Sequence, residues 1–183
     1  MPLTKPVSRK HLHSRNIECK GYEREDGLWD IEAHLVDSKT YSFDNHDRGT
    51  VASGEPVHDM WIRLTVDENL TIQHAEATTD SGPFTICSDV NAKFKQLEGL
   101  KIAPGWRKAV FGQMGGANGC THLNDLLIGP LAVAAFHTVS VAKAKRKVSS
   151  NPNQKPALLD TCHAFASDGP VVEREWPEFY QAS

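Results

Sequence analysis

The chain has 183 residues, of which 39% are hydrophobic and 23% charged, proportions that suit a single globular domain, or a domain with a tail, and exclude a disordered or fibrous chain. Its formal net charge of −3 leaves no overall positive field to gather phosphates, so a nucleic-acid partner is not expected. The sequence shows no apolar run of membrane-spanning length and no apolar secretory leader, which predicts a cytoplasmic protein without a membrane partner.

The first half of the chain has the patterns of antiparallel strands. Residues 15–24 read as a strand that ends at the turn Glu25-Asp26-Gly27. The next segment alternates, which is typical of a half-buried strand. One face of that strand carries Trp29, Ile31, Ala33 and Leu35, and the other carries Asp30, Glu32 and His34. The second face is expected either to be solvated or to form the wall of a polar pocket.

Two further strands are predicted after a polar stretch at residues 44–55 that reads as a loop. They cover residues 60–66 and 70–79, with a turn at Asp67-Glu68-Asn69 between them. Together the four strands would form a meander or a pair of hairpins. His74 is expected to be packed, whereas His11, His13 and His46 are expected in exposed loops.

The second half changes to helical periodicity. Helices are predicted over residues 83–97 and 104–111, followed by a glycine-rich loop over residues 112–119. A long apolar helix is predicted from Cys120 to about Lys147, with a kink or break at Pro130. The expected architecture is α+β, with the helices on one face of the sheet. Residues 1–147 would form the domain, and residues 148–183 an extended tail packed on it.

The segment 115–122 carries the strongest candidate for chemistry. Cys120 lies at the mouth of the long helix, where unpaired N–H groups favour a thiolate, the form that binds metals or attacks electrophiles. His122 follows it and is a second candidate metal ligand. The alternative is that Cys120 is a small buried hydrophobe and that His122 caps the helix locally.

The second candidate is the segment 55–61. His58 is a candidate metal ligand and Asp59 a candidate general base, unless the two form only a hydrogen-bonded turn. Asp80 would join this group as a ligand if the last two strands pair as a hairpin. The residues expected to bind substrate are Trp61, Trp106, Gly115, Gly116, Glu32 and His34. No P-loop, GxGxxG, GxSxG or HExxH motif occurs.

Four long motifs resemble an uncharacterised bacterial family, a domain of unknown function, which implies no activity. They are GYEREDGLWDIEAHL at 21–35, EPVHDMW at 55–61, GCTHL at 119–123 and DTCHA at 160–164. The layout of residues 55–147 is also similar to the iron–sulfur scaffold family of the IscU/NifU type. In that comparison His58, Asp80 and Cys120 fall near the three ligand cysteines, which implies that they converge. Gly119 replaces the scaffold family's histidine, and a set with one thiolate suits an iron–sulfur cluster poorly.

The sequence favours a metal-dependent enzyme of hydrolase or lyase type that acts on a small molecule. A divalent zinc or iron ion would be held by His58, Cys120 and Asp80 or His122, with Asp59 as base. Three alternatives stay open. The protein could be a metal-binding or scaffold-like accessory protein, a metal-free module that binds an anion at the Gly115–Gly119 loop, or an enzyme with Cys120 as nucleophile. A homo-oligomer is compatible with the sequence.

Overall fold

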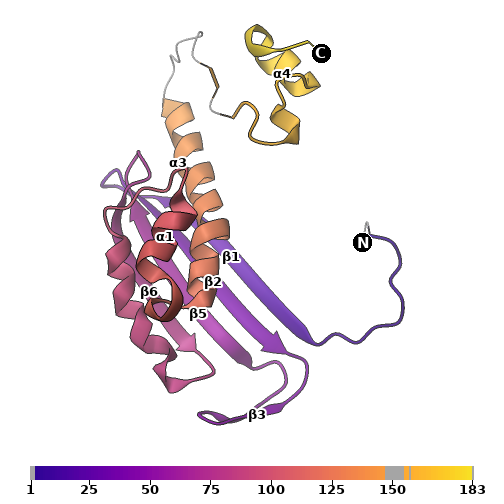
Figure 1. Cartoon of the computed structure of the whole chain (residues 1–183), viewed down its shortest axis with the longest axis vertical. Coiled ribbons are helices and arrows are strands. Elements are labelled where there is room, and N and C mark those ends of the chain that lie inside the picture. Colours follow the sequence, from indigo (N-terminus) through magenta and orange to yellow (C-terminus); the bar gives the residue numbers. More distant parts are fainter. Residues whose placement is uncertain (1–2, 147–154, 157, 183) are drawn as a thin grey trace. The chain divides into compact units, whose positions relative to one another are not determined.

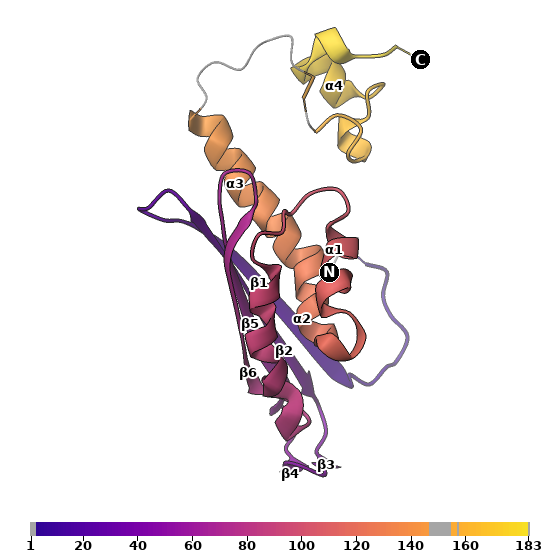
Figure 2. The same cartoon turned by 60° about the vertical axis from the view of Figure 1, so that its left-hand side comes forward.

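The protein is described by a computed structural model, which covers residues 3–146, 155–156 and 158–182. It divides into two units, residues 1–144 and 145–183. The first unit is an α+β domain in which a four-stranded antiparallel sheet is covered on one face by helices (Figures 1 and 2). The predicted fold class is therefore confirmed.

The sheet is a meander with the strand order β1-β2-β5-β6. Its strands are β1 (His13–Glu23), β2 (Trp29–Lys39), β5 (Pro56–Val66) and β6 (Ile72–Ser81). The stretch predicted as a loop contains a small hairpin of β3 (Phe43–Asn45) and β4 (Gly49–Val51), inserted between β2 and β5. Strand β5 begins four residues earlier than predicted, so His58 lies within the strand and not in the loop before it.

The alternation predicted for β2 is confirmed, and it sets the two faces of the sheet. Trp29, Ile31, Ala33 and Leu35 are fully buried against the helices, and the inward-facing residues of β5 join them in one hydrophobic core. The same inward row ends in Asp37, whose carboxylate is also buried. A charged side chain at the end of an apolar row needs partners, because an isolated buried charge is costly.

The helical layer follows β6. It consists of η1 (Thr85–Leu97), α1 (Trp106–Met114), η2 (Gly116–Asn118), α2 (Thr121–Leu126), η3 (Leu127–Leu131) and α3 (Ala132–Arg146). The segment predicted as a first helix is a 3₁₀-helix, η1. The break expected at Pro130 takes the form of the π-helical segment η3. Proline has no backbone N–H, so the regular series of helical hydrogen bonds is interrupted there.

The stretch Thr121–Lys143 is long and apolar enough to cross a membrane by length and composition alone. The expectation that the chain contains no such run was therefore wrong. One face of the same stretch contributes to the hydrophobic core, while only 28% of its 18-residue apolar window is buried. Its core residues are Leu123, Leu126, Leu127, Leu131, Ala135 and Val139.

The second unit is not the extended tail that its prolines suggested. Its described residues include the short helices η4 (His163–Phe165), α4 (Pro170–Glu175) and η5 (Pro177–Phe179). The rings of Phe165 and Trp176 lie 5.7 Å apart, and Asp160 Oδ1 accepts a hydrogen bond from the Ser167 backbone N–H. The packing of this segment on the domain stays a prediction.

Candidate functional site

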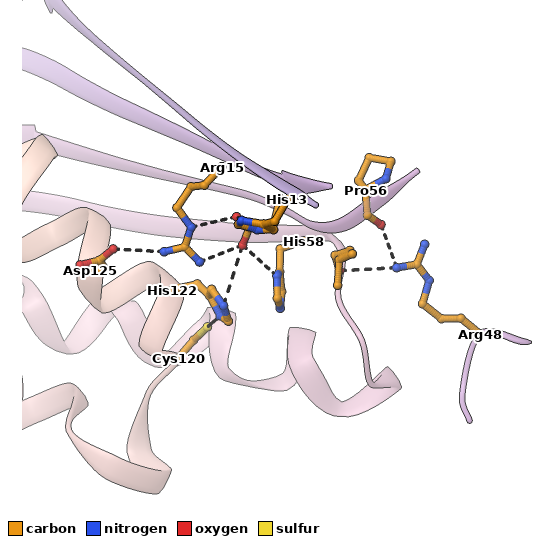
Figure 3. A network of polar contacts seen from close by, with 10 residues as sticks. His13, Arg15, Arg48, Pro56, His58, Cys120, His122 and Asp125 are labelled. Carbon is orange, nitrogen blue, oxygen red and sulfur yellow. Dashed lines mark hydrogen bonds and ion pairs between the residues drawn. The ribbon is translucent and has the colours of Figure 1, made fainter. Parts of the chain in front are cut away.

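A polar cluster occupies the end of the inner sheet face, where the apolar row of β2 stops at Asp37. The strand register places Arg15 of β1 and His58 of β5 directly opposite Asp37 on its two sides. Cross-strand neighbours on one face lie within side-chain contact, so the register itself brings these three groups together. His122, on the first turn of α2, completes the cluster from the helical layer (Figure 3).

Arg15 holds the Asp37 carboxylate in a two-pronged contact. Its Nε and Nη2 atoms donate to Oδ1 and Oδ2, each at 2.8 Å, while the Asp37 side chain is only 3% exposed. Arg15 Nη1 also contacts Asp125 of α2 at 3.3 Å (Figure 3). Parallel hydrogen bonds from a guanidinium fix the plane of a carboxylate as well as stabilising its charge.

Two histidines lie on the remaining side of this carboxylate. His58 Nδ1 is 3.0 Å from Asp37 Oδ2, and His122 Nε2 is 4.0 Å from the same oxygen. An ionised carboxylate only accepts hydrogen bonds, so His58 Nδ1 carries the proton. The two imidazole rings face each other with centroids 3.8 Å apart. His13, expected in a loop, begins β1 instead and places Nε2 3.3 Å from Asp37 Oδ1.

The environment favours an ionised Asp37 and neutral histidines. Burial by itself raises the pKa of Asp37, but the hydrogen bonds and charge of Arg15, together with His58, bring that pKa below its ordinary value. Burial lowers the pKa of His58, and the Arg15 and Arg48 charges add to this; Asp37 opposes it without cancelling it. Burial also lowers the pKa of His122, helped by the neighbouring His58 and Arg15. These protonation states are the ones that a metal ion requires of its ligands.

The turn before α2 positions His122. Asn124 donates through its side-chain amide to the Met114 carbonyl at 2.6 Å, which ties the start of α2 to the end of α1. A side chain at Gly119 would meet that same carbonyl at 2.1 Å, so the close approach requires glycine. The backbone then enters α2 at Cys120, whose carbonyl accepts from the Asn124 N–H at 2.9 Å.

The potential ligand atoms of Asp37, His58 and His122 all lie within 4.8 Å of one another. Of the residues predicted as metal ligands, His58 and His122 belong to this group. Cys120 lies beside it, with Sγ 3.8 Å from His122 Nδ1, the ring nitrogen on the other side from Asp37. Cys120 is not a member of the group of described residues whose ligand atoms all lie within 4.8 Å of one another.

Asp80 was expected to supply the carboxylate, and the structure places it elsewhere. The register of β5 and β6 shifts at this point, where Asp59 pairs with Ser81 and Met60 with Thr79. Asp80 is the extra residue between these pairs, is exposed and lines a separate hollow with Arg48. Asp37 supplies the carboxylate instead.

Asp59, the expected base, lies on the opposite face of the sheet. Successive residues of a strand point to opposite sides, so Asp59 cannot share the inner face with His58. Its Oδ1 is 2.7 Å from His34 Nε2, and the Trp61 ring stacks on that imidazole at 3.6 Å. Asp59 therefore cannot serve as a base for the cluster.

The residues expected to bind substrate do not line the hollow beside the cluster. Glu32 and Trp61 line a different hollow on the outer face, and His34 lies under Trp61. Trp106 is buried in the core and donates through Nε1 to the Leu127 carbonyl at 2.8 Å. Gly115 and Gly116 shape the turn after α1, where Gly116 has a φ of 58°.

The hollow beside the cluster has a volume of about 580 Å³ and lies between the start of β5, η1 and the turn before α2. His58, Cys120 and His122 line one part of it. The two histidines of the cluster therefore face a space that a small molecule can enter, whereas Asp37 stays buried behind them. A volume of this size is typical of small-molecule sites.

The first unit is thus an α+β domain with a carboxylate–histidine cluster next to a hollow. Residues 13–137 match the family described as "Protein of unknown function (DUF2889)", and the chain belongs to that family. The matched residues include every member of the cluster. No curated protein and no solved structure matches the chain. The resemblance in layout to iron–sulfur scaffolds stays a prediction.

Proposed function

We propose that the protein is a metal-dependent enzyme that acts on a small molecule. The observation that carries this proposal is the group formed by Asp37, His58 and His122, two of which also line the adjacent hollow. A site made only for stability has no need to face such a hollow.

The chemistry of the donor set suits a catalytic metal ion. Two imidazoles and one carboxylate serve in catalytic zinc sites and in non-haem iron(II) sites, where the remaining positions stay open for water or substrate. An ion held in this way would polarise a substrate oxygen or activate a water molecule, as hydrolases and lyases require. Coordination through His58 Nδ1 would require the other neutral tautomer of this ring, in which the proton is carried by Nε2 instead of Nδ1.

The charges around the cluster also suit a cation. Arg15 lies between Asp37 and Asp125, so these three groups together carry a net charge of about −1 when the histidines are neutral. Arg15 would act as the outer partner that orients a ligand carboxylate, a role that carboxylate ligands commonly need.

Metal titration of the purified protein tests the proposal. After treatment with a chelator, the wild-type chain should bind one equivalent of zinc, and cobalt(II) in its place should give a visible absorption spectrum that reports direct coordination. His58→Ala and His122→Ala should reduce binding at least about tenfold, because loss even of a group that only orients a ligand costs that much. His74→Ala is the matched control, because His74 pairs with Glu98 on an exposed part of the sheet. The prediction that His74 is packed in the interior was therefore wrong.

Cys120→Ser separates this proposed ligand set, which consists of Asp37, His58 and His122, from the one expected from the sequence, which included Cys120. The variant should bind zinc as the wild type does. The proposal is rejected if the wild type binds no zinc, or if His58→Ala and His122→Ala bind one equivalent of zinc as tightly as the wild type does.

A second candidate function is supported by the alignment of Cys120, His122 and Asp37. His122 has one ring nitrogen 3.8 Å from the Cys120 sulfur and the other 4.0 Å from the Asp37 carboxylate. A thiol, an imidazole and an orienting carboxylate in this order are the parts of a cysteine nucleophile. Iodoacetamide should then alkylate Cys120 of the metal-free protein faster than the exposed Cys162, and His122→Ala should remove the difference. Equal alkylation of the two thiols would reject this candidate.

A further inference from the structure

The hollow beside the cluster has walls of a definite chemical character. Away from His58, Cys120 and His122 it is lined mostly by apolar side chains from β5, η1 and the turn before α2. These include Met60, Pro83, Phe84, Ile86, Val90 and Ala117. Apolar walls of this extent select a ligand with an apolar body.

The geometry of η1 determines which side chains form the long wall. This helix is 3₁₀ over all 13 residues from Thr85 to Leu97, an unusual length for that conformation. Because a 3₁₀-helix has three residues per turn, the residues at positions 87, 90 and 93 stand in one line along its axis. Cys87, Val90 and Lys93 all line the hollow, as this geometry requires.

Lys93 stands at the end of this row with a positive charge, and Asp89, which lies with Ile86 in the neighbouring row of the helix, also lines the hollow. Its side chain is exposed, and no ion pair or hydrogen bond of Lys93 occurs among the residues that the structure describes. Asp89 stands four positions earlier, which would pair it with Lys93 on an α-helix. On a 3₁₀-helix the two positions are a third of a turn apart, and although both side chains line the hollow, no ion pair joins them among the residues that the structure describes, so the ammonium group can contact a ligand.

We propose that the hollow binds a small apolar molecule with a carboxylate group, which Lys93 recognises, and that the rest of the molecule lies along η1 toward the Asp37–His58–His122 cluster. This inference rests on the proposed function, since it names the class of substrate for the same site. Lys93 is a specificity-determining residue in this arrangement and does not contact the metal ligands.

Binding of two matched probes tests the inference. 3-Phenylpropionate has an apolar body and a carboxylate, and 3-phenylpropanol has the same body with no charge. On zinc-loaded wild-type protein, calorimetric titration should show about tenfold tighter binding of the carboxylate, the effect of one charge-assisted hydrogen bond.

Lys93→Met keeps the length of the side chain and removes its charge. In this variant the carboxylate should bind no more tightly than the alcohol, while the affinity for the alcohol stays unchanged. Lys95→Met is the matched control, because Lys95 is exposed on the same helix but does not line the hollow, and it should leave the tenfold preference intact.

The outcomes separate this inference from the proposed function. If Lys93→Met still prefers the carboxylate, recognition occurs at the metal ion and the inference is overturned. The inference is also overturned if the wild type shows no preference for the carboxylate. Zinc stoichiometry is measured on the same preparations. If zinc does not bind, the probes are titrated against the metal-free protein, where dependence of the preference on Lys93 still decides the question.

Discussion

Replacing Arg15 by methionine tests the energetics of the buried cluster most directly. Arg15 donates two hydrogen bonds of 2.8 Å to a carboxylate that is 3% exposed, so its removal leaves the charge of Asp37 largely uncompensated. Loss of one partner of a buried ion pair costs about 3–5 kcal/mol. Since the Arg15 side chain is itself 33% exposed, water can enter, and we expect a loss near the lower end, about 3 kcal/mol.

Urea unfolding of the metal-free protein, in a chelating buffer, measures this loss as a shift of the midpoint at constant slope. Arg24→Met is the matched control. Arg24 makes the same two-pronged contact with Asp26, at 3.0 and 2.7 Å, but that carboxylate is 50% exposed. Its Nη1 also contacts Asp30 at 3.2 Å, and Asp30 keeps a second partner in the hydroxyl group of Thr65 when Arg24 is replaced. Exposed pairs contribute up to about 1 kcal/mol each, so with its two partners Arg24→Met should cost about 1 kcal/mol, well below the loss in Arg15→Met.

A double variant completes the test. Arg15→Met combined with Asp37→Leu removes both charges and should be more stable than Arg15→Met alone, because no buried charge is then left unpaired. The reasoning is refuted if Arg15→Met and Arg24→Met cost the same, or if the double variant is the least stable of the three.

Two further predictions concern packing and pH. Gly21→Ala should destabilise the domain by about 2 kcal/mol, because the added carbon would meet Thr138 Oγ1 of α3 at 1.9 Å, and Thr138→Ala in the same chain should recover part of the loss in urea unfolding. The free energy of unfolding of the metal-free protein should also fall as the pH decreases from the ordinary histidine pKa of 6.5. The unfolded chain takes up protons there, whereas the folded chain resists protonation of His58 and His122 until their lowered pKa values are reached. His58→Gln should flatten this dependence, and an unchanged slope in that variant would contradict the assignment.

The part of the fold that depends on local periodicity could be predicted from the sequence. The alternation from Trp29 to Leu35 predicted both the strand and its buried face, since a period of two follows from strand geometry alone. The 3₁₀ character of η1 could not be predicted in this way, because its apolar positions Phe94 and Leu97 also fit an α-helix.

The candidate site could be predicted only in part. His58 and His122 were found because they stand in unusual polar segments, whereas Asp37 was missed although the alternation reaches it two residues after Leu35. A carboxylate that continues an apolar face is an informative exception and was the available signal. In β5, Met60 and Ile62 point inward, and His58 is two residues before Met60 on the same face. A prediction that began this strand at Pro56 would therefore have placed His58 on the inner face and Asp59 on the outer face.

The cluster draws its members from β1, β2, β5 and α2, and one of its contacts, between Arg15 and Asp125, spans 110 positions of the chain. A nascent or truncated chain that ends before α2 therefore has no site. The proposed ion would then bind only to the completely folded domain. At a free ion concentration of one hundred times the dissociation constant, binding would add about 2.7 kcal/mol to the free energy of unfolding. Under the proposed function, supply of the ion would therefore influence how much of the folded polypeptide persists in the cell.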